Sequence, residues 1–547
     1  MALQFILGPA RSGKTTYIYD RIIRESMEKP DQEFFLLVPD QSTLNAQREL
    51  VTRHPAHGTM NIDVVGFFRL AYRIFEELSY VPKNLLEDEG KSMVIRKVME
   101  KNRKNLKIFG SSMKKPGFIE ELKSFFAEMY QYDVSRKDLE DAAEHMKHPA
   151  LRAKMDDILL VMTEFEDYIQ ERYLISEQLL DVLAGKMEES RKLKNAVFYL
   201  DGFTGFTPIQ RKVIQKLMKI GQKVFISMTV DEAAVSKEYR EYELFALPKK
   251  ERMILMRDAM ELGVKVEKDI FCRPDDRGSA QLRHLERNLF RYPYRAWKGE
   301  CQDICVFQAM NPRTESQIIA GRIETLVRKH GYQYKDIVVL TADLESYGSE
   351  LERSFQDFHI PYFVDANRKL KNNPCIETIL SALKMIQKDF SYDMVFRYLK
   401  SGFSCLNQEE ADLLENYVIA MGIRGYSRWN RPFETEIFSK EEQERIEPLR
   451  IRFMDEIRPL KEGLKKRGET VLGKLTCLYE FLERLNIEQK MEDKKQKFEE
   501  AGDPAQAKTY GRVYGQVLDL MEQMADILGE EKLSYDDFLS VLETGME

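Results

Sequence analysis

The stretch LQFILGPARSGKTT, residues 3–16, joins a short apolar strand to a glycine-bounded loop and then to a helix that begins near Lys14. The loop from Gly8 to Thr15 fits the pattern G-x-x-x-x-G-K-[ST] without a gap. In such a loop the backbone N–H groups and the positive end of the following helix both face a phosphate group. The stretch therefore predicts a nucleotide-binding α/β domain at the start of the chain.

We expect this loop to bind ATP together with Mg²⁺. Lys14 is expected to reach the β- and γ-phosphates, and the Thr15 hydroxyl is expected to ligate the metal ion. The expected nucleotide-binding residues are Gly8, Pro9, Ala10, Arg11, Ser12, Gly13, Lys14, Thr15 and Thr16.

A second acidic ligand for Mg²⁺ is expected after a hydrophobic strand. The strand AVFYL (196–200) delivers Asp201, so Thr15 and Asp201 are the expected metal ligands. The alternative is that Asp201 only caps the turn before a helix at 207. The next residue is Gly202, where a helicase-type ATPase usually has a catalytic Glu. We therefore assign no catalytic residue beyond Asp201, and we expect bound nucleotide with slow or absent turnover.

Outward from the loop, strands and helices alternate, with further strands at 34–38 and 61–65. This alternation is typical of a parallel sheet with helices packed on it. The pattern turns helical at 85–193 and returns to the sheet at 196. We expect a first α/β domain from residues 1–84 and 194–300, interrupted by a helical insertion.

A second α/β unit is expected at 301–374. Its predicted strands are 303–309, 336–342 and 360–365, and its predicted helices are 316–331 and 346–357. Residues 375–547 are expected to form another helical block, inserted in the second domain as 85–193 is in the first.

The composition is that of an ordinary globular protein, with 43% hydrophobic and 32% charged residues. No run of about 18 apolar residues predicts a membrane span. The six cysteines are scattered and form no Cys-x-x-Cys pair, so they predict neither a metal site nor a disulfide framework. A net charge of −7 does not indicate nucleic-acid binding, but a local basic groove would suffice for it.

This arrangement resembles superfamily 1 helicases, whose two RecA-like P-loop domains each carry a helical insertion. More narrowly, the chain resembles the N-terminal half of the AddB family. The stretches that carry the resemblance are GPARSGKTT (8–16), LVPDQSTLNAQREL (37–50), FYLDGFTGFTPIQ (198–210), LFALPKKE (244–251), SAQLRHLERNLF (279–290) and the unit at 307–340.

The resemblance implies a helicase-like, ATP-binding and DNA-binding subunit of a cytoplasmic AddAB helicase–nuclease, a hydrolase complex. That complex resects DNA double-strand breaks for repair by homologous recombination, and an AddA-type subunit completes the heterodimer on single- and double-stranded DNA ends. An exonuclease domain with an iron–sulfur cluster would follow this region in a longer polypeptide. No membrane partner is implied.

Two departures indicate that this subunit is not the motor. The pair Asp201-Gly202 lacks the second carboxylate of working helicases, and Thr341, Ala342 and Asp343 stand where a phosphate-sensing Arg is usual. An active superfamily 1 translocase is the alternative reading. A small-molecule kinase is disfavoured by the length of the chain, and a scaffold with a relic loop is disfavoured by the intact Lys14-Thr15.

The resemblance also implies a surface that reads the Chi sequence on single-stranded DNA. By that analogy the expected DNA-binding residues are Gln41, Thr43, Phe67, Arg69 and Phe206. Phe67 and Phe68 begin an apolar-striped helix, so one of them is expected in the core. The segment RGYSRWNRPF (424–433) could stack on DNA, dock on a partner subunit or close a helix end by cation–π packing.

Overall fold

The computed structural model describes residues 1–58, 60–112, 115, 117–170, 172–231, 240–273, 278–364, 373–433 and 439–546. The chain forms two compact units. Unit 1 comprises residues 1–275 together with 370–547, and unit 2 comprises residues 276–369.

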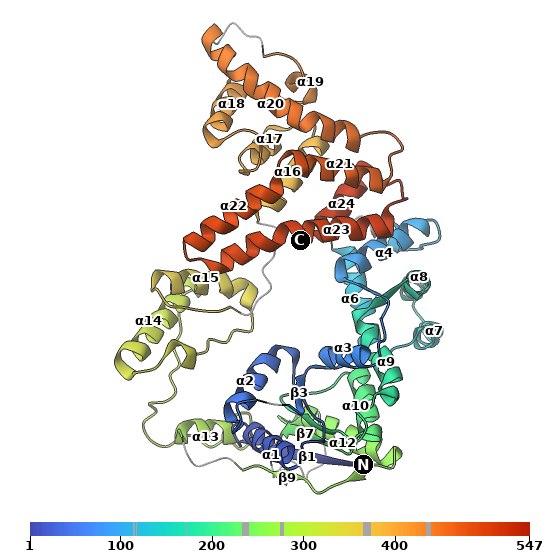
Figure 1. Ribbon diagram of the computed structural model, residues 1–547, viewed down its shortest axis with the longest axis vertical. Coiled ribbons are helices and arrows are strands. Elements are labelled where there is room, and N and C mark those ends of the chain that lie inside the picture. Colours follow the sequence, from blue (N-terminus) through green and yellow to red (C-terminus); the bar gives the residue numbers. More distant parts are fainter. Residues whose placement is uncertain are drawn as a thin grey trace. The chain divides into compact units, whose positions relative to one another are not determined.

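A seven-stranded sheet organises the first part of unit 1 (Figure 1). Its order is β3-β2-β6-β7-β1-β8, β9 also pairs with β1, and every pair is parallel. The strands are β1 (Ala2–Gly8), β2 (Phe34–Leu37), β3 (Ile62–Val65), β6 (Val197–Leu200), β7 (Lys223–Thr229), β8 (Lys265–Val266) and β9 (Ile270–Phe271). Strands from before and after residues 85–193 thus share one sheet, and the predicted α/β class with a parallel sheet is confirmed.

Helices cover both faces of this sheet because alternate strand residues point to opposite sides. On one face Leu3, Phe5 and Leu7 pack with α3 (Phe67–Glu77), α9 (Ser176–Lys186), α10 (Pro208–Ile220) and α12 (Ala246–Glu261). On the other, Ile6 packs with α1 (Lys14–Glu28) and α2 (Thr43–Arg53). The strands are therefore almost wholly buried, and the sheet's polar chemistry is left to the loops at its carboxyl edge.

A helical insertion leaves the sheet after α3. Its two ends are held side by side by the parallel pair β4 (Asn84–Leu86) and β5 (Tyr173–Ile175). Between them lie α4 (Asp88–Lys101), α5 (Phe109–Ser112), α6 (Phe118–Gln131), α7 (Arg136–Glu144) and α8 (Pro149–Gln170). The short 3₁₀ helix η2 (Met187–Glu189) follows α9 and leads the chain back to β6.

The C-terminal block of unit 1 has only helices as regular elements in its described residues. Its helices are α16 (Pro374–Gln387), α17 (Tyr392–Leu399), α18 (Gln408–Met421), α19 (Tyr426–Trp429), α20 (Lys440–Leu464), α21 (Val471–Arg484), α22 (Ile487–Glu500), α23 (Pro504–Leu528) and α24 (Tyr535–Gly545). One continuous hydrophobic core joins this block to the insertion. The helix α4 lies against α23 and α24, where Figure 1 shows them together.

Unit 2 contains α13 (Ala280–Asn288), α14 (Pro312–His330), η3 (Tyr334–Asp336) and α15 (Leu344–Asp357). A small core of Ala320, Ile323, Leu351, Phe355 and Ile360 packs α14 against α15. Gly331 ends α14 in the left-handed conformation (φ 74°), at the glycine where the sequence predicts the end.

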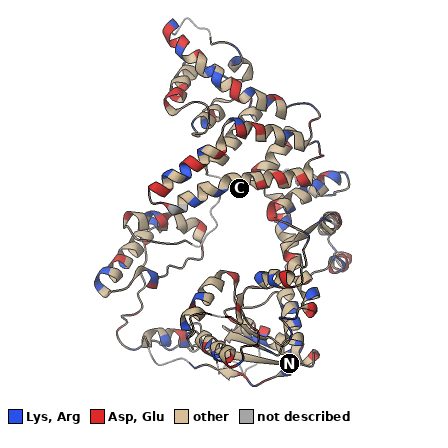
Figure 2. Cartoon of the chain, in the orientation of Figure 1, with Lys and Arg blue, Asp and Glu red and all other residues tan. Residues whose placement is uncertain are grey.

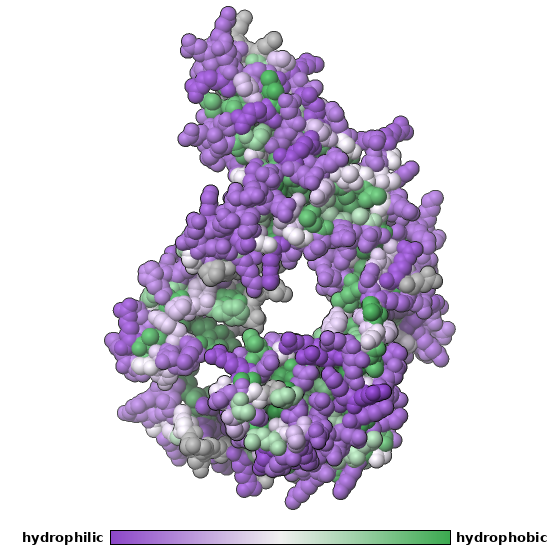
Figure 3. All heavy atoms as spheres, viewed as in Figure 1, coloured by the Kyte–Doolittle hydropathy of each residue, from purple (hydrophilic) through white to green (hydrophobic). Residues whose placement is uncertain are grey.

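The three strands predicted in unit 2 do not form among its described residues. Residues 303–309 and 337–342 are extended but pair in no sheet, and 360–364 behave likewise. Val306, Leu340 and Phe363 are about nine-tenths exposed, and green apolar patches mark the region of α14 and α15 in Figure 3. The apolar, β-branched pattern does indicate extended backbone, but a strand also needs a hydrogen-bonding neighbour.

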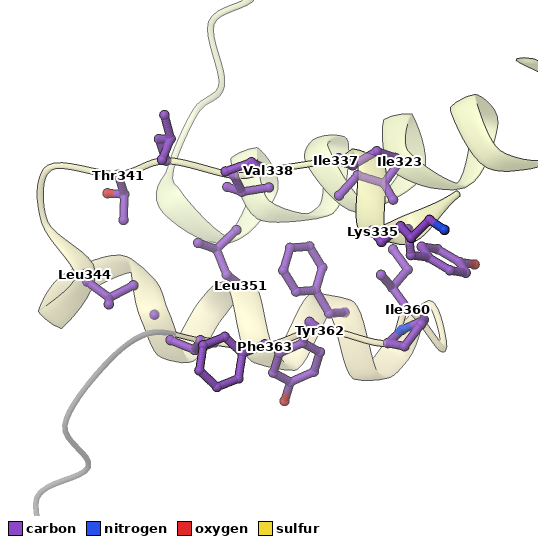
Figure 4. A pocket seen from close by; sticks show the side chains of 17 residues that line it. Ile323, Lys335, Ile337, Val338, Thr341, Leu344, Leu351, Ile360, Tyr362 and Phe363 are labelled. Carbon is purple, nitrogen blue, oxygen red and sulfur yellow. The ribbon is translucent and has the colours of Figure 1, made fainter. Parts of the chain in front are cut away.

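A cavity of about 730 Å³ lies between two of these extended segments (Figure 4). Ile337, Val338 and Thr341 line one side, and Tyr362 and Phe363 line the other. The wall is mostly apolar, as expected for two strand-like segments with open edges. It has none of the clustered charge that a catalytic pocket would need.

Candidate functional site

The predicted phosphate-binding loop connects β1 to α1 at the carboxyl edge of the sheet. Two of its residues adopt the left-handed region, Arg11 at φ 58° and Gly13 at φ 80°. Gly8 is required for space, since a Cβ there would lie 2.4 Å from both the Cys272 carbonyl oxygen and Ser12 Oγ. The pattern of glycines thus follows from backbone conformation at Gly13 and from close packing at Gly8.

The side chain of Lys14 lies across the loop. Its Nζ donates hydrogen bonds to the carbonyl oxygens of Gly8 and Pro9, each at 2.9 Å. Gly13 is the N-cap of α1 and has no side chain to satisfy the first-turn N–H groups of that helix. The loop therefore brings an ammonium group and a helix N-terminus to one place, which suits an anion.

Burial within the loop is uneven. Gly8, Pro9 and Ser12 are buried and Lys14 is half-buried, whereas the exposed members are Ala10, Arg11, Gly13, Thr15 and Thr16. The Ser12 hydroxyl is buried and has no hydrogen-bond partner among the described residues. A buried polar atom without a partner is costly, and a phosphate oxygen or its water would satisfy it. The residues of the loop thus fit a nucleotide phosphate.

Asp201 ends β6 and is 5% exposed. Strand β7 lies between β6 and β1, so the carboxylate and the loop are separated by one strand at the same edge. Ser227 on β7 donates its hydroxyl hydrogen to Asp201 Oδ1. Asp201 and Thr15 line one cavity of about 400 Å³, an arrangement that fits a magnesium ion held by a hydroxyl, a carboxylate and phosphate oxygens.

The wall of this cavity includes residues that the sequence did not point to. Tyr19 comes from α1, and Glu49 and Arg53 come from α2. Burial raises the pKa of Tyr19 to about 12, and the negative charges of Asp201 and Glu49 add to that rise. Glu49 and Arg53 form an ion pair of 2.7 Å. Asn45, Glu49 and Arg53 follow a four-residue spacing, which is the one signal that could have placed them on a shared helix face.

The predicted DNA-binding residues lie at the same edge of the sheet but differ in exposure. Gln41 and Arg69 are exposed. Thr43 is 7% exposed, and its hydroxyl donates to the Asp40 carbonyl oxygen at 2.9 Å. Burial raises the pKa of the Asp40 carboxyl, and the Arg69 guanidinium opposes that rise. The exposed pair can meet a nucleic acid directly, whereas Thr43 holds the turn at η1 (Asp40–Ser42).

The aromatic members of the predicted surface are packed against one another. Phe67 is 3% and Phe206 8% exposed, and their ring centroids are 6.4 Å apart in an edge-to-face arrangement. The ring of Phe203 packs on both, at 5.5 and 5.2 Å. Phe67 and Phe206 therefore present no free ring face for a base in this structure, which corrects the expectation of direct stacking. The neighbouring Phe68 is 40% exposed.

The arginine-rich segment 424–433 is built into the core of the C-terminal block. Trp429 and Phe433 are buried, and Arg450 donates to the Trp429 carbonyl oxygen at 2.8 Å. The Lys461 ammonium lies 3.6 Å from the centroid of the Tyr426 ring. Of the three roles open to this segment, the structure supports cation–π packing at a helix end.

Two negative findings hold for the described ranges of the chain. No helix there is long and apolar enough to cross a membrane. No group of three or more His, Cys, Asp or Glu side chains there could hold a metal ion without further ligands.

Comparison with known proteins covers the whole chain in two parts. Residues 5–286, more than half of the chain, match the family described as "ADDB, N-terminal". Residues 285–545 match the family described as "UvrD-like helicase C-terminal domain".

Curated relatives named as the AddB subunit of an ATP-dependent helicase/deoxyribonuclease match from end to end of this chain. The protein of Lachnoclostridium phytofermentans is 36% identical over 560 residues, which cover 100% of this chain and 49% of the relative. That of Clostridium botulinum (strain Hall) is 33% identical over 562 residues, again 100% and 49%. That of Caldanaerobacter subterraneus subsp. tengcongensis is 33% identical over 561 residues, 100% and 48%. The chain spans about half the length of these relatives, and by sequence and fold it belongs to the AddB N-terminal family.

Proposed function

We propose that this chain is the ATP-binding, DNA-binding helicase-like part of a subunit of an AddAB-type helicase–nuclease. The complex would resect DNA double-strand breaks for recombinational repair in the cytoplasm. Its partner would be an AddA-type helicase–nuclease subunit, and its substrates would be single- and double-stranded DNA ends. A nuclease domain with an iron–sulfur cluster would belong to the rest of such a polypeptide.

The nucleotide site is the observation that carries this proposal. Lys14, Thr15 and the first-turn N–H groups of α1 would bind the phosphates, and Thr15 and Asp201 would hold Mg²⁺. Bound Mg²⁺ would neutralise phosphate charge. The buried hydroxyl of Ser12 supports occupancy by an anion, because it has no partner in the described structure.

The subunit is proposed to bind ATP without acting as the motor. The residue after Asp201 is Gly202 at φ 80°, a conformation that favours glycine over the glutamate of a working ATPase. Glu49 lines the same cavity but is paired with Arg53, so it is not a free base. The site is thus built to bind a nucleotide and is poorly equipped to activate water.

We further propose that the exposed edge at Gln41 and Arg69 recognises single-stranded DNA, including a Chi-like sequence. Both side chains are exposed beside the nucleotide domain's sheet edge. An amide and a guanidinium are suited to base edges and phosphates. Phe67, Phe203 and Phe206 would support this edge from beneath.

Calorimetric titration with Mg²⁺–ATP tests the nucleotide site. The Lys14→Ala variant is expected to bind about 10–100-fold more weakly, since a hydrogen bond to a charged group contributes ~1.5–3 kcal/mol. Lys29→Ala, an exposed lysine at the end of the same helix, is the matched control and should bind as the wild type does.

DNA-stimulated ATP hydrolysis by the same chain, with no partner subunit present, tests the non-motor role. Turnover near the background rate, unchanged by oligonucleotide, is expected. Brisk DNA-stimulated turnover that is lost in Lys14→Ala would instead establish an active superfamily 1 translocase.

A further inference from the structure

A short segment of unit 2 combines positive charge with aromatic side chains. This basic–aromatic segment, residues 283–298, reads RHLERNLFRYPYRAWK and holds one carboxylate, Glu286. Its cations are Arg283, Arg287, Arg291, Arg295 and Lys298. In a chain whose net charge is −7, such a local excess of positive charge is an electrostatic feature of its own. Figure 2 shows blue Lys and Arg positions along α13 and the loop after it.

The segment has a defined conformation, because its loop is tied back to the helix α13. His284 on the helix forms a hydrogen bond of 2.7 Å with the Arg295 carbonyl oxygen. Its ring also packs edge to face on Trp297, with centroids 5.3 Å apart. At the helix start, Gln281 Oε1 accepts hydrogen bonds from the backbone N–H groups of Gln302 and Asp303, at 3.0 and 2.7 Å.

The aromatic rings of this loop face solvent. Phe290 is 83%, Tyr292 96% and Tyr294 77% exposed, and Trp297 is 39% exposed. Single exposed apolar residues are common on proteins, but four aromatic rings within eight residues form a patch, which is the usual mark of a binding surface. The rings are held outward by a loop whose backbone is fixed at both ends.

The cations beside these rings are available to a ligand. Arg287, Arg295 and Lys298 form no ion pair with any residue that the structure describes. Arg287 lies in the last turn of α13, and Arg295 and Lys298 flank Trp297 in the sequence. Exposed rings and unpaired cations therefore alternate along one short stretch of chain.

We propose that the basic–aromatic segment binds single-stranded DNA, as a site separate from the Gln41–Arg69 edge of the other unit. Ring faces stack on unpaired bases of any sequence, while Arg and Lys neutralise phosphates. A duplex keeps its base faces covered, so the aromatic half of the segment would be unused on it. The choice of DNA over another polyanion rests on the proposed function, whereas the preference for unpaired bases rests on the exposed rings.

Fluorescence anisotropy with the whole 547-residue chain and a labelled oligo(dT) tests this site. An oligonucleotide of about 20 nucleotides exceeds the ~4–16 that one single-strand-binding fold covers. The variant Phe290→Ala/Tyr292→Ala/Tyr294→Ala removes three rings. Tyr132→Ala/Tyr242→Ala/Tyr332→Ala removes three other exposed rings, 61%, 81% and 50% exposed, and is the matched control.

The loop variant is expected to bind oligo(dT) at least about tenfold more weakly, since one base–ring stack alone is worth ~1–3 kcal/mol. The control variant should bind as the wild type does. Arg287→Gln/Arg295→Gln/Lys298→Gln should lower the slope of log affinity against log salt by about 2, at ~0.7 per phosphate contact on a single strand. Circular dichroism and Mg²⁺–ATP affinity should be unchanged in every variant.

Three results would overturn the inference. One is unchanged oligo(dT) affinity in the loop variant, and another is an equal loss of affinity for a blunt duplex. The third is a change of oligomeric state in the loop variant without loss of DNA binding, which would make the rings a contact between copies of the chain. Gln41→Ala/Arg69→Ala tests the other DNA edge independently, so loss there with no loss in the loop variant overturns only this inference.

Discussion

Gly202 decides what the nucleotide site can do, because of both its position and its backbone. It directly follows Asp201 and adopts φ 80°, with the Pro39 ring 3.5 Å from where a Cβ would lie. A side chain is therefore sterically tolerated but conformationally strained. The absence of a catalytic glutamate at 202 is thus coupled to the shape of the turn, and restoring the carboxylate alone would not restore the geometry of a motor.

Gly202→Ala is expected to lower the free energy of unfolding by about 1 kcal/mol. Left-handed backbone costs a non-glycine residue ~1–2 kcal/mol, and the stiffer unfolded chain returns ~0.4–1 kcal/mol of this. Denaturant titration measures the change. Gly205→Ala is the matched control, because Gly205 has no left-handed φ and its nearest neighbour would be an ordinary 3.8 Å contact. Equal stability of the two variants would contradict the strain at Gly202.

The sequence predicted the contiguous part of the site and missed the part assembled by packing. Lys14 and Thr15 stand in one motif, and Asp201 is found at the end of a buried strand, so local pattern suffices for them. Tyr19 and Glu49 reach the cavity only because α1 and α2 pack on the same face of the sheet. Phe67 and Phe206 are predicted on the surface because a loop aromatic looks alike whether it packs inward or outward.

At the scale of elements, the end of α3 fastens the chain where it returns from the insertion. The Glu77 carboxylate accepts hydrogen bonds from Ser190 Oγ at 2.6 Å and from the N–H groups of Arg191 and Lys192 at 2.7 and 3.1 Å. Burial alone would raise the pKa of Glu77, but these hydrogen bonds hold it below its usual value of 4.5. The ionised carboxylate thus fixes the approach to β6, the strand that carries Asp201.

Glu77→Gln is expected to destabilise the protein by about 1–2 kcal/mol at neutral pH, because hydrogen bonds to a charged acceptor are lost or weakened. A depressed folded-state pKa gives stability that is present above pH 4.5 and is lost as the pH falls through the folded value. Melting temperatures of variant and wild type should therefore converge in acid. Glu76→Gln, at a carboxylate whose side chain is 78% exposed, should change little at any pH. A gap between Glu77→Gln and wild type that stays constant down to pH 3 would refute the linkage.

Strand formation in unit 2 shows where local pattern is insufficient. Helices α14 and α15 appear where periodicity predicts them, because a helix completes its hydrogen bonds within itself. Residues 337–341 and 360–364 have apolar strand composition, but no strand in the described residues lies beside them. In the first domain the same type of sequence, at β2 and β6, does form strands because each has neighbours on both sides.

Hydrogen exchange should separate these two kinds of extended segment. The amides of 338–340 have no backbone hydrogen bond among the described residues, whereas those of β7 lie in the middle of the sheet. We expect exchange at 338–340 near the rate of an unfolded peptide and slow exchange at 224–228, since protection follows hydrogen bonding and burial. Peptide-resolved mass spectrometry measures both in one experiment. Comparable protection of the two would mean that the unit 2 segments are paired in solution.

At the scale of the whole of unit 1, the two helical blocks are one folding unit although about 200 residues of sequence separate them. Core residues from 86–175 and from 375–546 belong to a single hydrophobic cluster. Polar contacts seal its edge: Arg96 pairs with Asp537 at 3.3 Å, and Lys97 donates to the Ile527 carbonyl oxygen at 2.8 Å. The sequence showed two insertions by their helical periodicity, but it carried no signal that their apolar faces meet.

Met93→Ala tests whether this shared core makes the blocks cooperative. Met93 is 3% exposed on α4 and belongs to the common cluster, so its truncation should cost about 2–5 kcal/mol. Because the core is continuous, hydrogen-exchange protection should fall in α24 as well as in α4, and thermal unfolding of both should shift together. Met253→Ala, at a 56% exposed methionine on α12, should leave both blocks unchanged. Loss of protection confined to residues 88–170 would show that the insertion unfolds alone and that the contact with the C-terminal block is only a surface one.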